Sequence, residues 1–358
     1  PMIWSDMYFR LASKTGDYYD PEAVVPKEIA AEIPGGTKMV YWDYYHDSKD
    51  FYKHQLQRHK SLGAAPVFAG GVWTFNGPGT NYGKTFATSC PALEACKEEG
   101  VKEVFITVWN DGGAENNFFS SLLGFQLYAE AGYAEVLDDR KLRKRAKFCT
   151  GVDYEAFMDL RLLDEIPGTP RDNLMCSNPS RYFLWQDILL GLFDNYAENP
   201  EIAAHYARLE EKMKASREKY KDFGFLFEVP EKLCSVLKLK ADIGVRLKKY
   251  YDQRDLEMLR QAAATILPQI SLNVDLLRKT HKEQWFRTNK PFGWETLDLR
   301  YGGLLARIDT AIHRIWDFLD GKIDKIEELE EQKLYFFNHA DRSEDDELNS
   351  SYGAIARV

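Results

Sequence analysis

Three pairs of residues near the start of the chain have types and a spacing that suit the binding of a polyol or a sugar. Each pair is an aromatic residue followed two positions later by an aspartate: Trp4 and Asp6, Tyr41 and Asp43, Trp109 and Asp111. A ring offers a flat apolar face and a carboxylate accepts hydrogen bonds, which matches the C–H faces and hydroxyl rim of a pyranose. The alternative is that the rings only close a core and Asp43 caps the next helix.

The segments that carry these pairs are predicted to be strands of one parallel sheet. Apolar runs at Met2–Asp6, Met39–Asp43, Pro66–Trp73 and Glu103–Trp109 alternate with helical patterns. Such strand–helix units imply right-handed crossovers, and a (β/α)8 barrel needs about 250 residues, so this region supplies about half a barrel. Because residues two apart on a strand share a face, the pairs are expected to meet at the barrel mouth. Trp73 ends the third strand without an acid, and its ring lines either the mouth or the core.

The rest of the chain is predicted to be helical. We expect residues 1–135 to form the second half of a barrel and residues 136–358 to form a helical C-terminal domain. Before it, an apolar helix is expected over Ala114–Ala131. An aromatic-rich loop is expected at 284–295, either packed between helices or over the barrel mouth, and 341–350 is expected to be a polar surface loop.

Composition excludes several classes of function. The net charge of -9 disfavours nucleic acid, and the basic run 140–145 suits a solvated helix face. No apolar run approaches the roughly 20 residues of a membrane helix. The five cysteines form no CxxC pair, which favours a reduced cytoplasmic protein without a structural metal. Residues 79–85 only approximate a phosphate loop and the histidines lack metal-ligand spacing, so neither a cofactor nor a metal is expected.

The order and local text of the motifs resemble a known family. The stretches PMIWSDMYFR, VYWDYYH and VWNDGG, followed by a long helical region, are similar to the last four βα units and C-terminal domain of glycoside hydrolase family 20. The likeness is to its bacterial intracellular N-acetyl-β-D-glucosaminidases, which are exo-acting β-N-acetylhexosaminidases, and it covers essentially the whole chain.

The resemblance implies a substrate-assisted retaining mechanism, in which the 2-acetamido oxygen of the sugar attacks C1 and forms an oxazolinium ion. It implies that Tyr41 hydrogen-bonds the acetamido carbonyl as the catalytic residue. It also implies that Asp43 and Asp111 bind the 4- and 6-hydroxyls of a terminal N-acetylglucosamine or N-acetylgalactosamine. Trp109 would face the sugar ring, Trp4 would lie near the acetamido methyl, and Trp73 is a further candidate for the wall.

One departure from the family pattern affects activity. The family's Asp-Glu pair, with the glutamate as general acid, ends the fourth barrel strand, whereas this chain opens in what resembles the fifth. The expectation is half a pocket and no hydrolysis by this polypeptide alone. A non-catalytic carbohydrate-binding or oligomerisation module is the main alternative, and an unrelated sugar-active barrel is a third. The large apolar helical region makes a homodimer plausible.

Overall fold

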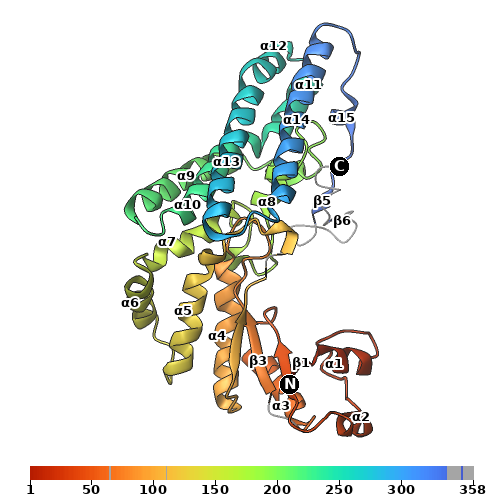
Figure 1. Ribbon diagram of the computed structural model, residues 1–358. Coiled ribbons are helices and arrows are strands. Elements are labelled where there is room, and N and C mark those ends of the chain that lie inside the picture. Colours follow the sequence, from red (N-terminus) through yellow and green to blue (C-terminus); the bar gives the residue numbers. More distant parts are fainter. Residues whose placement is uncertain (64–65, 110, 337–347, 350–358) are drawn as a thin grey trace. The chain divides into compact units, whose positions relative to one another are not determined.

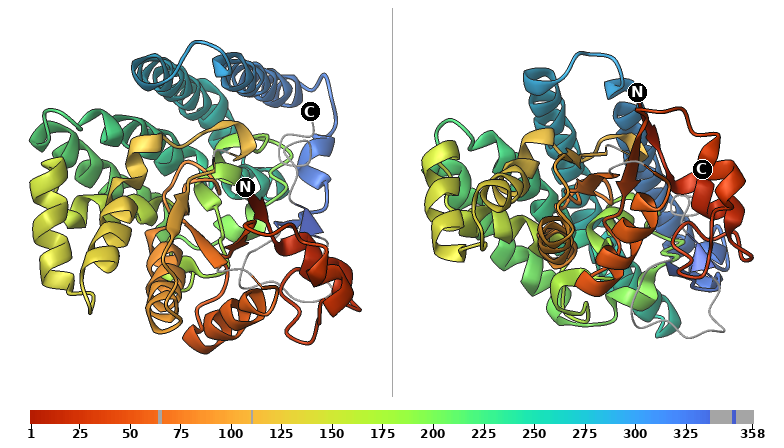
Figure 2. Two further views of the ribbon diagram at one scale, coloured as in Figure 1. Left: turned by 60° about the horizontal axis from the view of Figure 1, so that its bottom comes forward. Right: turned by 90° about the horizontal axis from the view of Figure 1, so that it is seen from below.

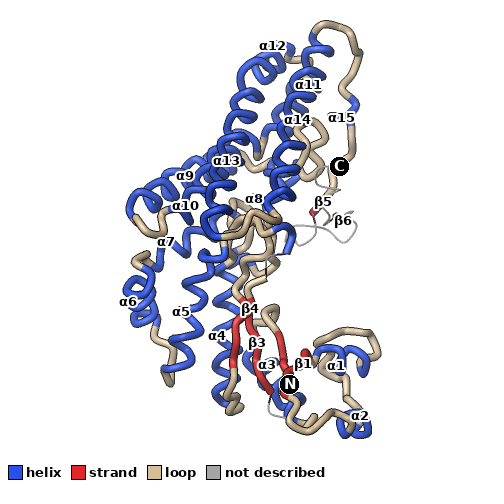
Figure 3. The backbone as a smooth tube through the Cα atoms, viewed as in Figure 1, coloured by secondary structure: helices blue, strands red, loops and turns tan. Residues whose placement is uncertain are grey.

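The computed structural model describes residues 1–63, 66–109, 111–336 and 348–349. The chain is a mixed α/β protein that is mostly helical and contains a small parallel sheet (Figures 1 and 3). It divides into two compact units. The first unit comprises residues 1–73, 82–109 and 121–146, and the second comprises residues 74–81, 110–120 and the chain from residue 147 onward.

The first unit holds four parallel strands in the order β1-β2-β3-β4, as the sequence pattern predicts. Its strands are β1 (Met2–Trp4), β2 (Lys38–Trp42), β3 (Pro66–Gly71) and β4 (Val104–Thr107). Its helices are α1 (Asp6–Ala12), α2 (Lys27–Ala31), α3 (Lys49–Lys60), α4 (Tyr82–Glu98), α5 (Leu122–Tyr133) and most of α6 (Asp139–Thr150). Among the described residues β1 and β4 pair with one strand each, so these four strands form an open sheet.

Helices α3 and α4 pack on each other and against one face of this sheet (Figure 2). The core there contains Tyr41, Tyr52, Leu56 and Phe68, each at most 3% exposed. The central strand β3 is buried along its whole length. Gly70 allows helix α5 to approach it, because a Cβ there would lie 1.9 Å from the Tyr128 hydroxyl oxygen.

The second unit is a helical domain. Its α-helices are α7 (Tyr154–Asp159), α8 (Pro179–Trp185), α9 (Glu201–Lys219), α10 (Phe225–Lys240), α11 (Ile243–Asp252), α12 (Leu256–Gln261), α13 (Leu267–Thr288), α14 (Trp294–Leu319) and α15 (Glu327–Glu330). Short 3₁₀ turns are η1 (Asp111–Gly113), η2 (Phe118–Ser121), η3 (Leu160–Leu163), η4 (Arg171–Asn173) and η5 (Asp194–Ala197), of which η2 ends at the boundary with the first unit, and η6 (Ala262–Ile266) is a π-helical turn. Two-residue strands β5 (Tyr335–Phe336) and β6 (Leu348–Asn349) pair in parallel.

Two segments differ from the sequence-based expectation. The expected loop at 284–295 is mostly helical, because α13 continues to Thr288 and buries Trp285 beside Trp294 at the start of α14. The helix expected from Ala114 begins only at Leu122, since Ala114 has a φ of 54° and the Asn117 side chain accepts the backbone N–H of Phe119. The expected surface loop at 341–350 lies almost wholly outside the described residues.

A search of the described helices for a membrane span found none with the necessary length and apolar character.

Candidate functional site

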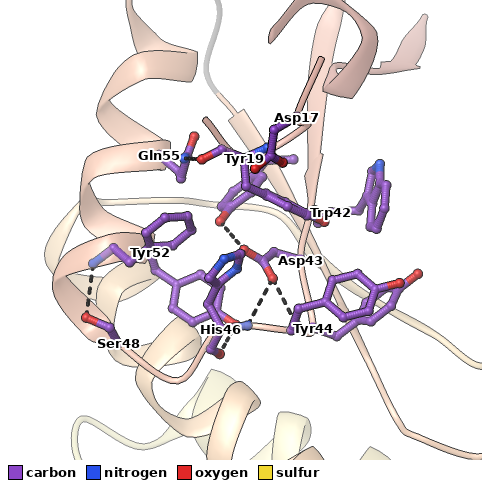
Figure 4. A network of polar contacts seen from close by, with 12 residues as sticks. Asp17, Tyr19, Trp42, Asp43, Tyr44, His46, Ser48, Tyr52 and Gln55 are labelled. Atoms are coloured by element: carbon purple, nitrogen blue, oxygen red, sulfur yellow. Dashed lines mark hydrogen bonds and ion pairs between the residues drawn. The ribbon is translucent and has the colours of Figure 1, made fainter. Parts of the chain in front are cut away.

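The carboxylate of Asp43, directly after β2, is the centre of a polar network (Figure 4). Its Oδ2 accepts hydrogen bonds from the Tyr41 hydroxyl at 2.7 Å and from Nδ1 of His46 at 2.8 Å. Its Oδ1 accepts the backbone N–H groups of Tyr45 at 2.9 Å and His46 at 3.4 Å. Asp43 is only 1% exposed, so these donors replace the water that an ionised carboxylate needs.

Tyr41 lies beneath this network on the helix-covered face of the sheet. Its ring packs against Tyr52, Phe68 and His59, with centroid distances of 6.4, 5.6 and 4.8 Å. Burial, and next the charge of Asp43, hold the pKa of the Tyr41 hydroxyl well above its usual value. The hydroxyl is therefore protonated and donates to Asp43.

The strand register places Trp4 on the face of the sheet opposite Tyr41, and the meeting of the three aromatic–acid pairs at a barrel mouth stays a prediction. Trp4 pairs with Val40, and side chains paired in neighbouring parallel strands point the same way. Tyr41 is the next residue along β2 and so points to the other face. A two-residue spacing predicts a shared face only for side chains of the same strand. It says nothing about the register in which neighbouring strands pair.

Trp4 and Trp109 lie together on the face that the helices α3 and α4 leave open. Their ring centroids are 6.4 Å apart, and Trp4 also meets Phe105 edge-on at 5.9 Å. Trp4 is 45% exposed and Trp109 is 38% exposed. Two large rings that face solvent at the ends of parallel strands provide a surface on which an apolar sugar face could stack.

The position of Trp4 is set by its neighbour Ser5. The Ser5 hydroxyl oxygen lies 2.7 Å from both the carbonyl oxygen of Val40 and Nε2 of His59. His59 is 2% exposed, and burial lowers its pKa to about 4, so the imidazole is neutral. The end of β1 is thus tied to β2 and to helix α3.

Trp73 follows β3 and is buried, with 4% of its surface exposed. Its indole N–H donates to the carbonyl oxygen of Tyr44 at 2.8 Å, and its ring meets the rings of Tyr44 and Tyr45 edge-on. The Lys84 ammonium lies 4.8 Å from the Trp73 ring centroid. In this position Trp73 supports the more exposed rings beside it.

Asp111 is exposed and begins the turn η1 in the second unit. The structure therefore groups Tyr41 with Asp43, and Trp4 with Trp109, while the position of Asp111 relative to these residues stays a prediction. A search for groups of histidine, cysteine, aspartate and glutamate able to hold a metal found none in the described parts of the chain.

Sequence reasoning gave no role to three residues that lie near Asp43, namely Tyr19, Tyr45 and His46. Tyr45 is 43% exposed, and its ring lies near that of Tyr19. His46 stacks on Phe51 with a centroid distance of 3.9 Å. The sequence Asp43-Tyr44-Tyr45-His46 is typical of a local turn. The carboxylate of Asp43 accepts the backbone N–H groups two and three residues later, and such a turn exposes side chains within it.

Two buried carboxylates in the second unit were also missed. Glu115 accepts the indole N–H of Trp185 at 2.6 Å and pairs with Arg181 and Arg300 at 3.3 and 3.4 Å. Asp164 accepts the backbone N–H of Ser180, and burial raises its pKa to about 7. Both carboxylates join segments that are distant in the sequence, and their contacts are those of packing groups in the helical domain.

Comparison with known proteins identifies the helical region. Residues 155–348, just over half of the chain, match the family model described as the glycoside hydrolase 20C C-terminal domain. Among solved structures, a "GH138 enzyme targeting pectin rhamnogalacturonan II" is similar over 81% of this chain and 54% of its own, with 11% sequence identity and a TM-score of 0.35. This chain thus spans about half the length of that protein. No curated protein sequence matches.

Proposed function

Since the chain belongs to the glycoside hydrolase 20C family through its C-terminal domain, we propose that it is part of an exo-acting β-N-acetylhexosaminidase. Its substrate would be a terminal, non-reducing β-linked N-acetylglucosamine or N-acetylgalactosamine. The observation that carries the proposal is the exposed pair Trp4 and Trp109 on one face of a parallel sheet. Carbohydrate sites combine such rings with hydroxyl-binding polar groups.

In this proposal residues 1–135 contribute strands five to eight of a (β/α)8 barrel, and residues 136–358 form the helical C-terminal domain. The four consecutive parallel strands with helical crossovers support the first part. Hydrolysis would proceed by the substrate-assisted route through an oxazolinium ion, with retention of configuration. Its general acid would come from outside the four strands described above.

The roles proposed for the site residues combine the family resemblance with the contacts described above. Trp109 and Trp4 wall the sugar pocket, and Trp73 stabilises the neighbouring rings from beneath. Tyr41 and Asp43 form one hydrogen-bonded pair, in which the tyrosine hydroxyl is available to the acetamido oxygen only when it turns away from Asp43. Asp111 is proposed to bind a sugar hydroxyl.

Sugar binding by the 358-residue chain tests this proposal directly. N-acetylglucosamine should quench tryptophan fluorescence and bind in calorimetry, whereas glucose should bind more weakly because it lacks the acetamido group. Trp4→Ala and Trp109→Ala should each weaken binding about fivefold, since loss of one stacked ring costs about 1 kcal/mol. Trp316→Ala, in helix α14 of the other unit, is the matched control. Equal binding by Trp4→Ala, Trp109→Ala and wild type would show that these two tryptophans do not form the sugar site.

A hydrolysis assay tests the catalytic part separately. The 358-residue chain should release no aryl leaving group from an aryl N-acetyl-β-glucosaminide above background, because none of the described strands β1 to β4 is followed by an adjacent Asp-Glu pair. Release by the isolated chain would contradict this assignment of the acid. Sugar binding with no hydrolysis, also after a separate barrel half that carries an Asp-Glu pair is added, would instead favour a non-catalytic binding module.

Two further parts of the proposal concern location and assembly. All five cysteines are free thiols, which favours the reducing cytoplasm.

Helices α13 and α14 expose apolar side chains, among them Leu272 at 54% and Leu299 at 75%, which favours a homodimer. Sedimentation analysis of wild type and Leu299→Lys would test the dimer, which the charged side chain should dissociate.

A further inference from the structure

We infer that Glu115 is the positioning residue of Asp111, and that the helical domain thereby sets the direction of this proposed sugar contact. The inference rests on the proposed function, in which Asp111 binds a sugar hydroxyl. Asp111 begins the turn η1, and Glu115 follows it four residues later. Both residues belong to the second unit, together with the helices that contact Glu115.

The turn that carries Asp111 has little stiffness of its own. Asp111 is exposed, and the two residues that follow it in η1 are glycines. Gly113 has a φ of 100°, in a region that glycine adopts without strain. Because glycines leave the backbone many conformations, the side chain of Asp111 keeps one direction only if the chain beyond the turn is anchored.

Glu115 provides this anchor. It is 6% exposed, and its Oε1 accepts the indole N–H of Trp185 at 2.6 Å. Its Oε2 lies 3.3 Å from Nε of Arg181, and its Oε1 lies 3.4 Å from Nη1 of Arg300. Trp185 and Arg181 belong to α8 and Arg300 belongs to α14, so two helices hold one loop residue. Charge-assisted contacts of a buried carboxylate are strong and directional, which fixes its position.

Arg300 connects this anchor to the turn itself. A Cβ on Gly113 would lie 3.0 Å from Nη1 of Arg300, the same atom that pairs with Glu115. One guanidinium group therefore contacts both the glycine two residues after Asp111 and the carboxylate four residues after it. A change at Arg300 is thus expected to move the turn that carries Asp111.

The chain after Glu115 is held by the same domain. The side-chain amide of Asn117 donates to the hydroxyl of Thr288 at the end of α13, at 3.0 Å. The ring of Phe119 lies 6.2 and 6.3 Å from the rings of Phe223 and Phe225. Contacts with three helices, α8, α13 and α14, therefore determine where this loop runs and where Asp111 points.

A double-mutant cycle on the 358-residue chain separates positioning of Asp111 from packing alone. Calorimetry measures the binding of N-acetylglucosamine. Asp111→Ala should weaken binding about tenfold, the loss expected for a hydrogen bond to a charged group. Arg300→Met, which keeps a long apolar side chain, should weaken it about threefold to tenfold. The double variant should bind as Asp111→Ala does, because Arg300 acts on the sugar only through Asp111.

Glu115→Gln is the second variant of the cycle. Its amide oxygen still accepts the indole N–H of Trp185, while the charge opposite the two arginines is lost. It should also weaken binding in the wild-type background and have no further effect in the Asp111→Ala background.

The matched control is Arg307→Met, which removes another arginine of α14. Arg307 pairs with the buried carboxylate of Asp187 at 2.6 Å, so the same type of contact is lost, but sugar binding should stay as in wild type. Thermal unfolding of each variant checks that it is folded.

The outcomes separate the inference from the proposed function. Wild-type binding by Arg300→Met, an equal loss of binding in Arg307→Met, or a full additional loss in the double variant would each overturn the inference while the proposed function stands. Wild-type binding by Asp111→Ala would overturn the role of Asp111 and the inference with it. Failure of the wild-type chain to bind N-acetylglucosamine would overturn both the inference and the proposed function.

Discussion

The buried carboxylate of Asp164 makes the stability of the helical domain depend on pH in a direction that can be calculated. Asp164 is 5% exposed, and its Oδ2 lies against Gly79, where a Cβ would come within 2.5 Å. Burial is the main cause that raises its pKa to about 7, the charge of Glu115 adds to this, and the N–H of Ser180 opposes it. In the unfolded chain the same carboxyl titrates near about 3.9.

The sign follows from the protons bound in each state. Between the unfolded and folded pKa values the folded chain holds a proton that the unfolded chain has released, so the free energy of unfolding falls as pH rises from about 4 to about 7. Each pKa unit corresponds to about 1.36 kcal/mol, and about three units therefore give roughly 4 kcal/mol. Buried His281, whose pKa burial lowers to about 4, changes stability in the opposite direction between about pH 4 and 6.5.

The substitution Asp164→Asn isolates the effect, because an amide keeps the shape and an acceptor for the Ser180 N–H but does not ionise. The assay is urea unfolding of wild type and variant between pH 4.5 and 8. The free energy of unfolding of the variant relative to wild type should rise by about 3 kcal/mol over this range, because part of the full effect lies below pH 4.5. Asp309→Asn, at a side chain 72% exposed on α14, should leave the pH dependence as it is. A constant difference between Asp164→Asn and wild type would refute the reasoning.

Two further substitutions test packing. Gly70→Ala should lower the free energy of unfolding by about 1–3 kcal/mol, because the new Cβ would meet the Tyr128 hydroxyl. Adding Tyr128→Phe to the same chain should recover part of that loss, and urea unfolding measures both variants. Glu115→Gln should lower the free energy of unfolding by about 3 kcal/mol, because Arg181 and Arg300 both lose their negatively charged partner. The fluorescence of Trp185, which donates to Glu115, follows the unfolding. The control for Glu115→Gln is Glu257→Gln, at a side chain that is 84% exposed, which should leave the free energy of unfolding unchanged.

The sheet was predictable because its strands carry unusually clear local signals. The stretches of β2 and β3 are nearly continuous apolar runs bounded by turn residues, and such runs are typical of strands buried on both faces. Their order and parallel direction follow from the helical segments between them. The end of α13 was not predictable from local sequence. The stretch after Trp285 has the composition of a loop, and its helical structure depends on the packing of Trp285 against Trp294.

The faces of the site could not be predicted, because they depend on pairing between strands. The two-residue spacing of Tyr41 and Asp43 correctly brings their side chains together. It contains no information on which residue of β2 lies opposite Trp4, and an offset of one position moves a side chain to the other face.

The pattern of tyrosine, aspartate and histidine at positions 41, 43 and 46 explains why this part of the site is stable without a ligand. Isolation of a carboxylate from water costs several kcal/mol unless donors replace the solvent, and here every donor to Asp43 comes from within five residues. A local network of this kind forms together with the turn and needs no distant segment to complete it. In the proposed site, the partly or fully exposed side chains of His46 and Tyr45 would therefore be held in place before a sugar binds, which would reduce the entropy lost on binding.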